Sequence, residues 1–200
     1  MQIVLYGSYT SPYVRRVRVL ARELGLSYSL VNTAEAAGQA ALRAVSPVWK
    51  VPAAEIDGEL VLDSARITEA LMRAAGPGPL RLVQGPHRRH EENLIVVIDA
   101  VLDGLIRRFY AVRDGLDPEA WPQLVKERER ARACMEHLAG QLDGGGLRGL
   151  SGVGRAEIAL ATALGWMRLR GTFPIDELPE FVAFEAAWAA RPSMLATAPV

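Results

Sequence analysis

Short apolar runs alternate with amphipathic segments over the first 75 residues. Residues 2–6 and 28–32 are apolar runs of strand length, and each predicts a short strand. Between them, apolar residues recur at helical spacing after Ser11-Pro12. This pair suits the start of a helix, because serine caps and proline fits the first position. The pattern therefore predicts strand, helix and strand in this order.

The next segment predicts an Ala-rich helix over residues 34–45, followed by a hairpin and a third helix. Strands at about 53–57 and 60–63 are joined by Asp57-Gly58, a strong hairpin signal. Ser64 then opens a helix with an apolar face. The order βαβαββα describes a thioredoxin-like layer of helices on a mixed sheet.

The pattern changes at Gly76-Pro77-Gly78-Pro79, which ends the third helix. We expect a first domain of residues 1–76, a linker of residues 77–86 and an all-helical domain of residues 87–200, since no convincing strand follows the linker. Apolar stripes at helical spacing predict long helices there. The expected fold class is α/β plus all-α, a thioredoxin-like domain followed by an all-helical bundle.

Composition and charge narrow the classes of function. Lys and Arg number 23, as do Asp and Glu, and this zero net charge argues against a nucleic-acid binder driven by phosphate neutralisation. The single cysteine, Cys134, cannot form an intramolecular disulfide, and no Cys/His zinc spacing occurs, so we expect a reducing compartment and no metal site. No apolar run is long enough to span a bilayer, and the N-terminus lacks a signal-peptide pattern. We expect a cytoplasmic protein that contacts neither nucleic acid nor membrane.

Three short segments carry the candidate chemistry. They are Ser8-Tyr9-Thr10-Ser11-Pro12-Tyr13-Val14-Arg15-Arg16-Val17-Arg18, Ser46-Pro47-Val48-Trp49-Lys50-Val51-Pro52 and Leu62-Asp63-Ser64. In order and spacing they resemble the cytosolic glutathione transferases, particularly bacterial members whose first helix opens with Ser-Pro-Tyr or Ser-Pro-Phe. The resemblance covers the whole chain, because the linker and the helical region fall in the expected places.

Ser11 stands where a hydroxyl could meet a ligand at the start of a helix. A helix N-terminus favours an anion, a thiolate beside it has a lowered pKa, and a hydroxyl donor would stabilise that thiolate further. The resemblance implies that Ser11 has this catalytic role toward the thiol of glutathione. The alternative is that Ser11 only caps its helix, and Tyr6, Ser8 and Thr10 are nearby hydroxyls that could replace it.

The second segment is expected to bind the middle and one end of glutathione. The resemblance implies a cis peptide bond before Pro52, with the backbone of Val51 pairing with the cysteinyl part. It also implies that Lys50 meets the glycyl carboxylate. Trp49 departs from the family, which usually has glycine here, and this bears on the glycyl contact.

Two acidic residues and a serine are expected to complete the glutathione site. Ser64 opens a predicted helix, so its hydroxyl and the neighbouring N–H groups make a site for the γ-glutamyl carboxylate, while Asp63 supplies opposite charge for the ammonium group. Capping alone is the alternative, and the two roles are compatible. Asp99 shares a helix face with Asp103. The resemblance implies a homodimer in which Asp99 lies beside the partner subunit's glutathione; a solvated carboxylate is the alternative.

An electrophile pocket is expected between the loop near Tyr9 and Tyr13 and the helical domain. Its expected walls in the helical domain are Phe109, Tyr110, Arg113 and Trp166. The resemblance implies an enzyme of detoxification that takes glutathione as co-substrate, needs no cofactor and adds the thiolate to a small electrophile. The alternatives are a non-catalytic binding or regulatory protein on this fold, or a glutathione-dependent isomerase, peroxidase or dehalogenase.

Overall fold

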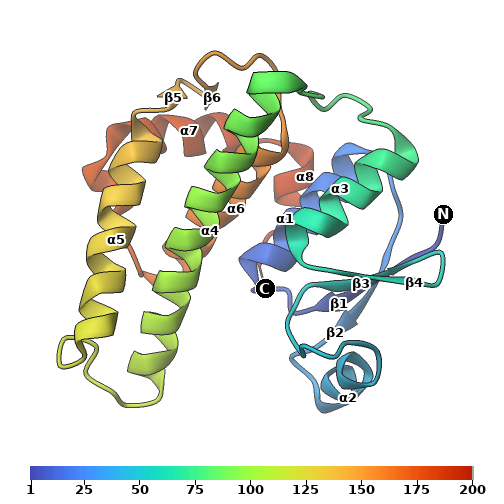
Figure 1. The fold of residues 1–200 in the computed structure, drawn as a ribbon, viewed down its shortest axis with the longest axis horizontal. Coiled ribbons are helices and arrows are strands. Elements are labelled where there is room, and N and C mark those ends of the chain that lie inside the picture. Colours follow the sequence, from blue (N-terminus) through green and yellow to red (C-terminus); the bar gives the residue numbers. More distant parts are fainter. Residues whose placement is uncertain (200) are drawn as a thin grey trace. The chain divides into compact units, whose positions relative to one another are not determined.

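The computed structural model describes residues 1–199 (Figure 1). The chain divides into two compact units. The first contains Met1–Leu82, Val153–Ile158 and the described residues from Ala189 onward, and the second contains Val83–Gly152 and Ala159–Trp188. The expected division of the chain near residues 76 and 87 stays a prediction. The contacts add that residues near the C-terminus belong to the first unit.

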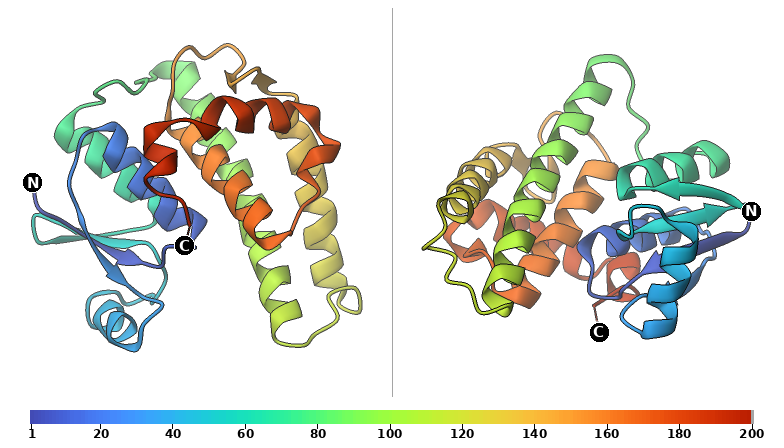
Figure 2. Two further views of the ribbon diagram at one scale, coloured as in Figure 1. Left: turned by 180° about the vertical axis from the view of Figure 1, so that it is seen from behind. Right: turned by 60° about the horizontal axis from the view of Figure 1, so that its bottom comes forward.

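The first unit is a four-stranded mixed sheet with helices on both faces, which confirms the thioredoxin-like βαβαββα prediction. Its elements are β1 (Ile3–Gly7), α1 (Pro12–Glu23), β2 (Ser29–Asn32), α2 (Ala36–Val45), β3 (Ala53–Ile56), β4 (Glu59–Leu62), α3 (Ser64–Ala75) and α8 (Pro192–Leu195). The strand order is β2-β1-β3-β4, with β1 parallel to β2 and antiparallel to β3. Helices α1 and α3 lie on one face and α2 on the other, while α8 packs beside α1 (Figures 1 and 2).

Helix α1 is held close against the sheet by its apolar face. Val14, Val17 and Leu20 are at most 1% exposed, and such burial stabilises a helix more than its intrinsic propensity does. Gly7 permits this approach, because a Cβ at that position would lie 2.2 Å from a methyl carbon of Val14. The N–H of Val14 donates to Ser11 Oγ at 3.3 Å, so Ser11 is the N-cap that the sequence predicts.

The β3–β4 hairpin turns at Asp57-Gly58, as predicted. Both residues have positive φ, 49° and 85°, the backbone that a tight two-residue hairpin turn requires. The side chain of Asp57 also accepts a hydrogen bond of 2.7 Å from the backbone N–H of Gln2. The turn is thereby tied to the start of the chain.

The second unit is mostly helical. Its elements are α4 (Gly85–Arg113), α5 (Pro122–Ala139), β5 (Leu142–Asp143), β6 (Gly146–Leu147), most of α6 (Arg155–Arg170), a 3-10 turn η1 (Ile175–Glu177) and most of α7 (Pro179–Ala189). The expected apolar stripe of α4 is buried, for example at Ile98 and Val101. The expectation that no strand follows the first domain is wrong at β5–β6, because strands of two residues leave no alternating pattern to recognise. No helix in residues 1–199 combines the length and the apolar character that crossing a membrane requires.

A buried ion pair joins the segment after α3 to the first turn of α6. The side chains of Arg81 and Glu157 are 9% and 1% exposed, and two parallel N–H···O bonds of 2.8 and 2.7 Å connect them. Glu157 also accepts a hydrogen bond of 2.9 Å from the backbone N–H of Gly154, so it reaches back to cap α6. One carboxylate therefore caps the helix and balances a buried guanidinium.

We expect Glu157→Gln to lower the free energy of unfolding by about 3–5 kcal/mol, because Arg81 would remain buried without its counter-charge. Urea denaturation at fixed protein concentration measures this loss. The double variant Arg81→Met/Glu157→Gln removes both charges and keeps an acceptor for Gly154, so it should lose less than the single variant. A single variant as stable as the parent protein would contradict the role given to this pair.

Candidate functional site

One end of the sheet brings the three candidate segments together. Strand β1 ends at Gly7, and its residue Tyr6 pairs with Ala53, the first residue of β3. Ala53 pairs in turn with Leu62, the last residue of β4. The loop after β1, the residues before β3 and the residues after β4 therefore leave the sheet at the same edge. The separate motifs of the sequence meet here because the strand register aligns them.

Ser11 is half-buried at the N-terminus of α1 in this edge. Its Oγ accepts the hydrogen bond from Val14, which uses a lone pair and leaves the hydroxyl proton for another acceptor. Capping and contact with a thiolate are therefore compatible. The capping role is confirmed, and the catalytic role stays a prediction.

Tyr6, the main rival of Ser11, has its hydroxyl proton committed elsewhere. It is 6% exposed in a cluster with Leu42 and Ala53, and it donates to a carboxylate oxygen of Glu55. That hydrogen bond, then burial and then the charge of Glu55 raise the pKa of Tyr6 to about 12. A phenol held in this way has no proton to offer a thiolate, so the geometry favours Ser11 over Tyr6.

The peptide bond between Val51 and Pro52 is cis, as the resemblance implies. Pro52 is buried and directly precedes β3. The register places this bond at the same edge as the loop that leads to Ser11. The backbone of Val51 is therefore well placed for an extended ligand that pairs with main-chain groups.

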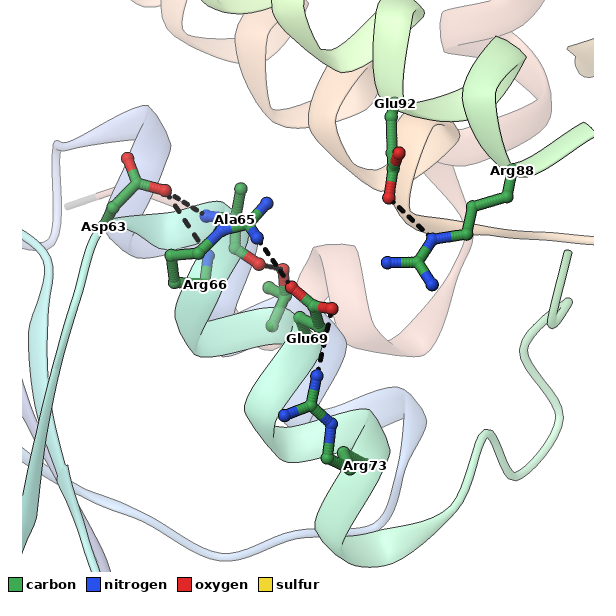
Figure 3. A network of polar contacts seen from close by, with 8 residues as sticks. Asp63, Ala65, Arg66, Glu69, Arg73, Arg88 and Glu92 are labelled. Carbon is green, nitrogen blue, oxygen red and sulfur yellow. Dashed lines mark hydrogen bonds and ion pairs between the residues drawn. The ribbon is translucent and has the colours of Figure 1, made fainter. Parts of the chain in front are cut away.

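Asp63 and Ser64 form the start of α3 at the same edge. Asp63 has a φ of 73°, an uncommon backbone for a residue with a side chain, and strained residues of this kind gather at ligand sites. One of its carboxylate oxygens accepts hydrogen bonds from the N–H groups of Ala65 at 2.8 Å and Arg66 at 3.4 Å, while the other points away from the helix (Figure 3). Capping is thus confirmed, and an acceptor remains for a cation.

Arg16 is a residue of this site to which the sequence assigned no role. It is 2% exposed, and it donates from Nη1 to Ser64 Oγ at 3.1 Å. Because that oxygen accepts from a guanidinium, the hydroxyl proton of Ser64 is directed elsewhere and can be donated to an anion. The signal in the sequence was an arginine inside a helix that packs on a sheet, because a buried guanidinium requires a polar partner.

Trp49 and Lys50 lie on the rim and are both exposed. Trp49 has a φ of 51°, in the left-handed region that glycine adopts most readily. Its ring lies 4.8 Å from the guanidinium carbon of Arg43. The predicted contact of Lys50 with a glycyl carboxylate stays a prediction.

Tyr9 and Tyr13, predicted to line the electrophile pocket, both lie beside arginines of α1. The Tyr9 ring is 4.9 Å from the guanidinium of Arg18, and the Tyr13 ring is 5.3 Å from that of Arg16. Both tyrosines are half-buried. Because Arg16 also donates to Ser64, Tyr13 is linked to Ser64 through Arg16, whereas Tyr9 contacts Arg18.

The expected pocket residues of the second unit form one aromatic group. Phe109 meets Tyr110 and Trp166 edge to face, at centroid distances of 5.5 and 6.0 Å. The guanidinium of Arg113 lies 4.5 Å from the Tyr110 ring. Trp166 is only 6% exposed, whereas Tyr110 is 47% exposed. Tyr110 is thus accessible to solvent, and Trp166 contributes mainly to packing.

Two further expectations concern acidic residues. Asp99 is half-buried on α4 and Asp103 is exposed, and the predicted role of Asp99 at a partner's glutathione stays a prediction. Residues 1–199 contain no group of three or more His, Cys, Asp or Glu side chains arranged to hold a metal ion.

Comparisons with known proteins identify the family of the chain. A family model described as the N-terminal domain of glutathione S-transferase matches residues 5–79. The uncharacterized GST-like protein YibF of Escherichia coli (strain K12) is 31% identical over 177 residues, which are 85% of this chain and 84% of that protein. A glutathione transferase family member from Pseudomonas fluorescens Pf-5, solved with bound glutathione, is 25% identical with a TM-score of 0.81, over 100% of both chains.

A further solved structure points the same way. The glutathione S-transferase of Methylobacillus flagellatus KT, solved with glutathione bound, is 25% identical over 100% of both chains, with a TM-score of 0.84. The match spans both units of the chain, as the resemblance of the sequence had implied. The chain therefore belongs to the glutathione S-transferase family.

Proposed function

We propose that the protein is a glutathione transferase, which binds reduced glutathione at the edge of the sheet and joins its sulfur to a small electrophile. The observation that carries this proposal is the meeting of Ser11, the cis Val51-Pro52 bond and Asp63-Ser64 at one edge. The glutathione bound in related structures supports the choice of ligand. No metal or redox cofactor takes part in the proposed reaction.

The thiol is activated at the N-terminus of α1. Free N–H groups and the positive end of the helix dipole favour the thiolate over the thiol, and the unused proton of Ser11 adds a charge-assisted hydrogen bond to the sulfur. The thiol proton leaves to solvent as the thiolate forms. The thiolate then forms a carbon–sulfur bond with the electrophile; in a substitution the carbon–halogen bond breaks and a halide leaves, and in an addition the displaced π electron pair takes a proton from solvent. Holding both reactants together supplies much of the remaining rate enhancement.

The rest of glutathione is recognised by opposite charge and by backbone pairing. Ser64, oriented by Arg16, donates to the γ-glutamyl carboxylate, and the outward oxygen of Asp63 accepts from the ammonium group. Val51 pairs with the cysteinyl backbone, and Lys50 meets the glycyl carboxylate. We further propose a cytoplasmic homodimer active in detoxification, with Asp99 beside the partner subunit's glutathione and the aromatic group of Phe109 and Tyr110 beside the electrophile.

We expect Ser11→Ala to lower kcat/KM for conjugation of glutathione to a chlorodinitrobenzene roughly tenfold to hundredfold, the worth of a hydrogen bond to a charged group. The pKa of bound glutathione should rise, which the ultraviolet absorbance of the thiolate measures. The variant also loses its helix cap, at about 1 kcal/mol, so its folding is checked by urea denaturation.

Two variants control for this result. Tyr6→Phe removes a hydroxyl that is already bonded to Glu55, and Ser8→Ala removes one from the same loop. Both should keep kcat/KM within about threefold of the parent. If Tyr6→Phe raises the pKa of bound glutathione and Ser11→Ala does not, the assignment of the thiol contact is wrong.

Titration of the protein with reduced glutathione tests the proposed binding site directly. We expect saturable binding, followed by calorimetry and by tryptophan fluorescence, with Trp49→Phe used to assign the signal to the rim. Ser64→Ala should weaken binding about tenfold, because a buried charge-assisted hydrogen bond is lost. Ser29→Ala on the edge strand β2 is the matched control and should bind as the parent does. If millimolar glutathione does not bind, the proposed transferase activity is wrong. The alternative of a binding protein with this fold would then be favoured.

A further inference from the structure

The first unit contains a concave site beside the C-terminal half of α1. It is a cavity of about 420 Å³ next to the segment that leads into β2. Its walls include Tyr9, Arg18, Arg22, Leu26, Tyr28 and Leu30. Ser11, Pro52, Asp63 and Ser64 are not among the residues that line it. The cavity is therefore a different place from the proposed glutathione site.

The positive charge beside this cavity comes from arginines on one face of α1. Arg15, Arg18 and Arg22 are three and four residues apart, so they share a face of the helix. Arg16 precedes Arg18 by two residues, and at about 100° per residue it points to nearly the opposite side, toward Ser64. One helix thus presents positive charge to two separate sites.

Arg18 is a buried cation that is held by neutral groups. It is 6% exposed; Nε donates to the Tyr28 hydroxyl at 3.1 Å, Nη1 donates to the Thr197 carbonyl at 3.4 Å, and the Tyr9 ring covers the guanidinium. Within residues 1–199, no carboxylate pairs with Arg18 or Arg22. A buried charge without a counter-charge is costly, so an anion in the cavity would be stabilised.

Glu23, the acidic residue nearest to Arg18 and Arg22 along the chain, is not their counter-charge. Glu23 accepts hydrogen bonds of 2.7 and 2.8 Å from Arg191 and a further one from Ser193. The pKa of Arg15 is lowered, first by burial and then by the positive charge of Arg18. Arg18, which lines the cavity, is thus close enough to Arg15 for their charges to repel.

The remaining groups define the chemistry of a ligand. Tyr28 accepts from Arg18, so its own proton is left for another acceptor. Leu26 and Leu30 add apolar surface to the wall. Arg22 alone could be explained by its place in the last turn of α1, where a cation favours the helix dipole. That explanation does not extend to Arg18, which is buried and faces a cavity.

We propose that this cavity binds a small organic carboxylate. Arg18 and Arg22 bind the carboxylate group, Tyr28 donates a hydrogen bond to it, and Leu26 and Leu30 contact the apolar part of the ligand. The ligand would touch none of Ser11, Pro52, Asp63 and Ser64, whereas Tyr9, an expected wall of the electrophile pocket, also lines this cavity.

Benzoate tests the site on the full-length chain, and benzamide is the neutral control of the same shape. We expect benzoate to bind saturably by calorimetry and to shift the backbone amide NMR signals of residues 26–30, with binding that weakens as salt rises. Benzamide should bind at least about tenfold more weakly. The same shifts should persist when glutathione is saturating.

Variants assign the binding to named groups. Arg22→Gln changes an exposed side chain and Tyr28→Phe removes only a hydroxyl, and each should weaken benzoate binding about tenfold. Arg43→Gln on α2 is the matched control and should bind benzoate as the parent does. Three outcomes would each overturn the proposal. The NMR signals of residues 26–30 do not move, benzamide binds as tightly as benzoate, or Ser64→Ala weakens benzoate binding and Arg22→Gln does not.

Discussion

The packing of α1 against the sheet is the constraint on which both sites depend. Val14, Val17 and Leu20 are essentially excluded from solvent, and Gly7 lets the helix approach the end of β1 more closely than any side chain would allow. This contact fixes both the position of the helix and its rotation about its own axis. The rotation decides that Ser11 and Arg16 serve one site and Arg18 the other.

The net charge of the chain conceals a local excess of positive charge. Lys and Arg balance Asp and Glu in number, yet Arg15, Arg16 and Arg18 are all at least nine-tenths buried in one helix. Their described partners include two hydroxyls, two carbonyls and two aromatic rings. An anion that approaches α1 therefore meets a field that composition alone does not reveal.

The sequence predicted what local patterns determine. The order of strands and helices, the Asp57-Gly58 turn and the cap at Ser11 follow from neighbouring residues, while the cis bond before Pro52 came from the family resemblance. The bonds from Tyr6 to Glu55 and from Arg16 to Ser64 were not predicted. Each joins residues nearly fifty positions apart, so each depends on a strand register or a helix rotation that periodicity cannot supply.

Position 49 holds tryptophan where the family usually has glycine, and this difference adds a side chain while the backbone conformation is kept. A left-handed φ of 51° explains why glycine suits this position, irrespective of any ligand. A residue with a Cβ costs roughly 1–2 kcal/mol there, and the contact with the guanidinium of Arg43 offsets about 0.5–1 kcal/mol of it. The backbone leading to Val51-Pro52 can thus be kept while an indole ring, 59% exposed, is added beside Lys50. The substitution bears on the rim of the site, where the glycyl end of glutathione is expected, and leaves the edge with Ser11 and Ser64 unchanged.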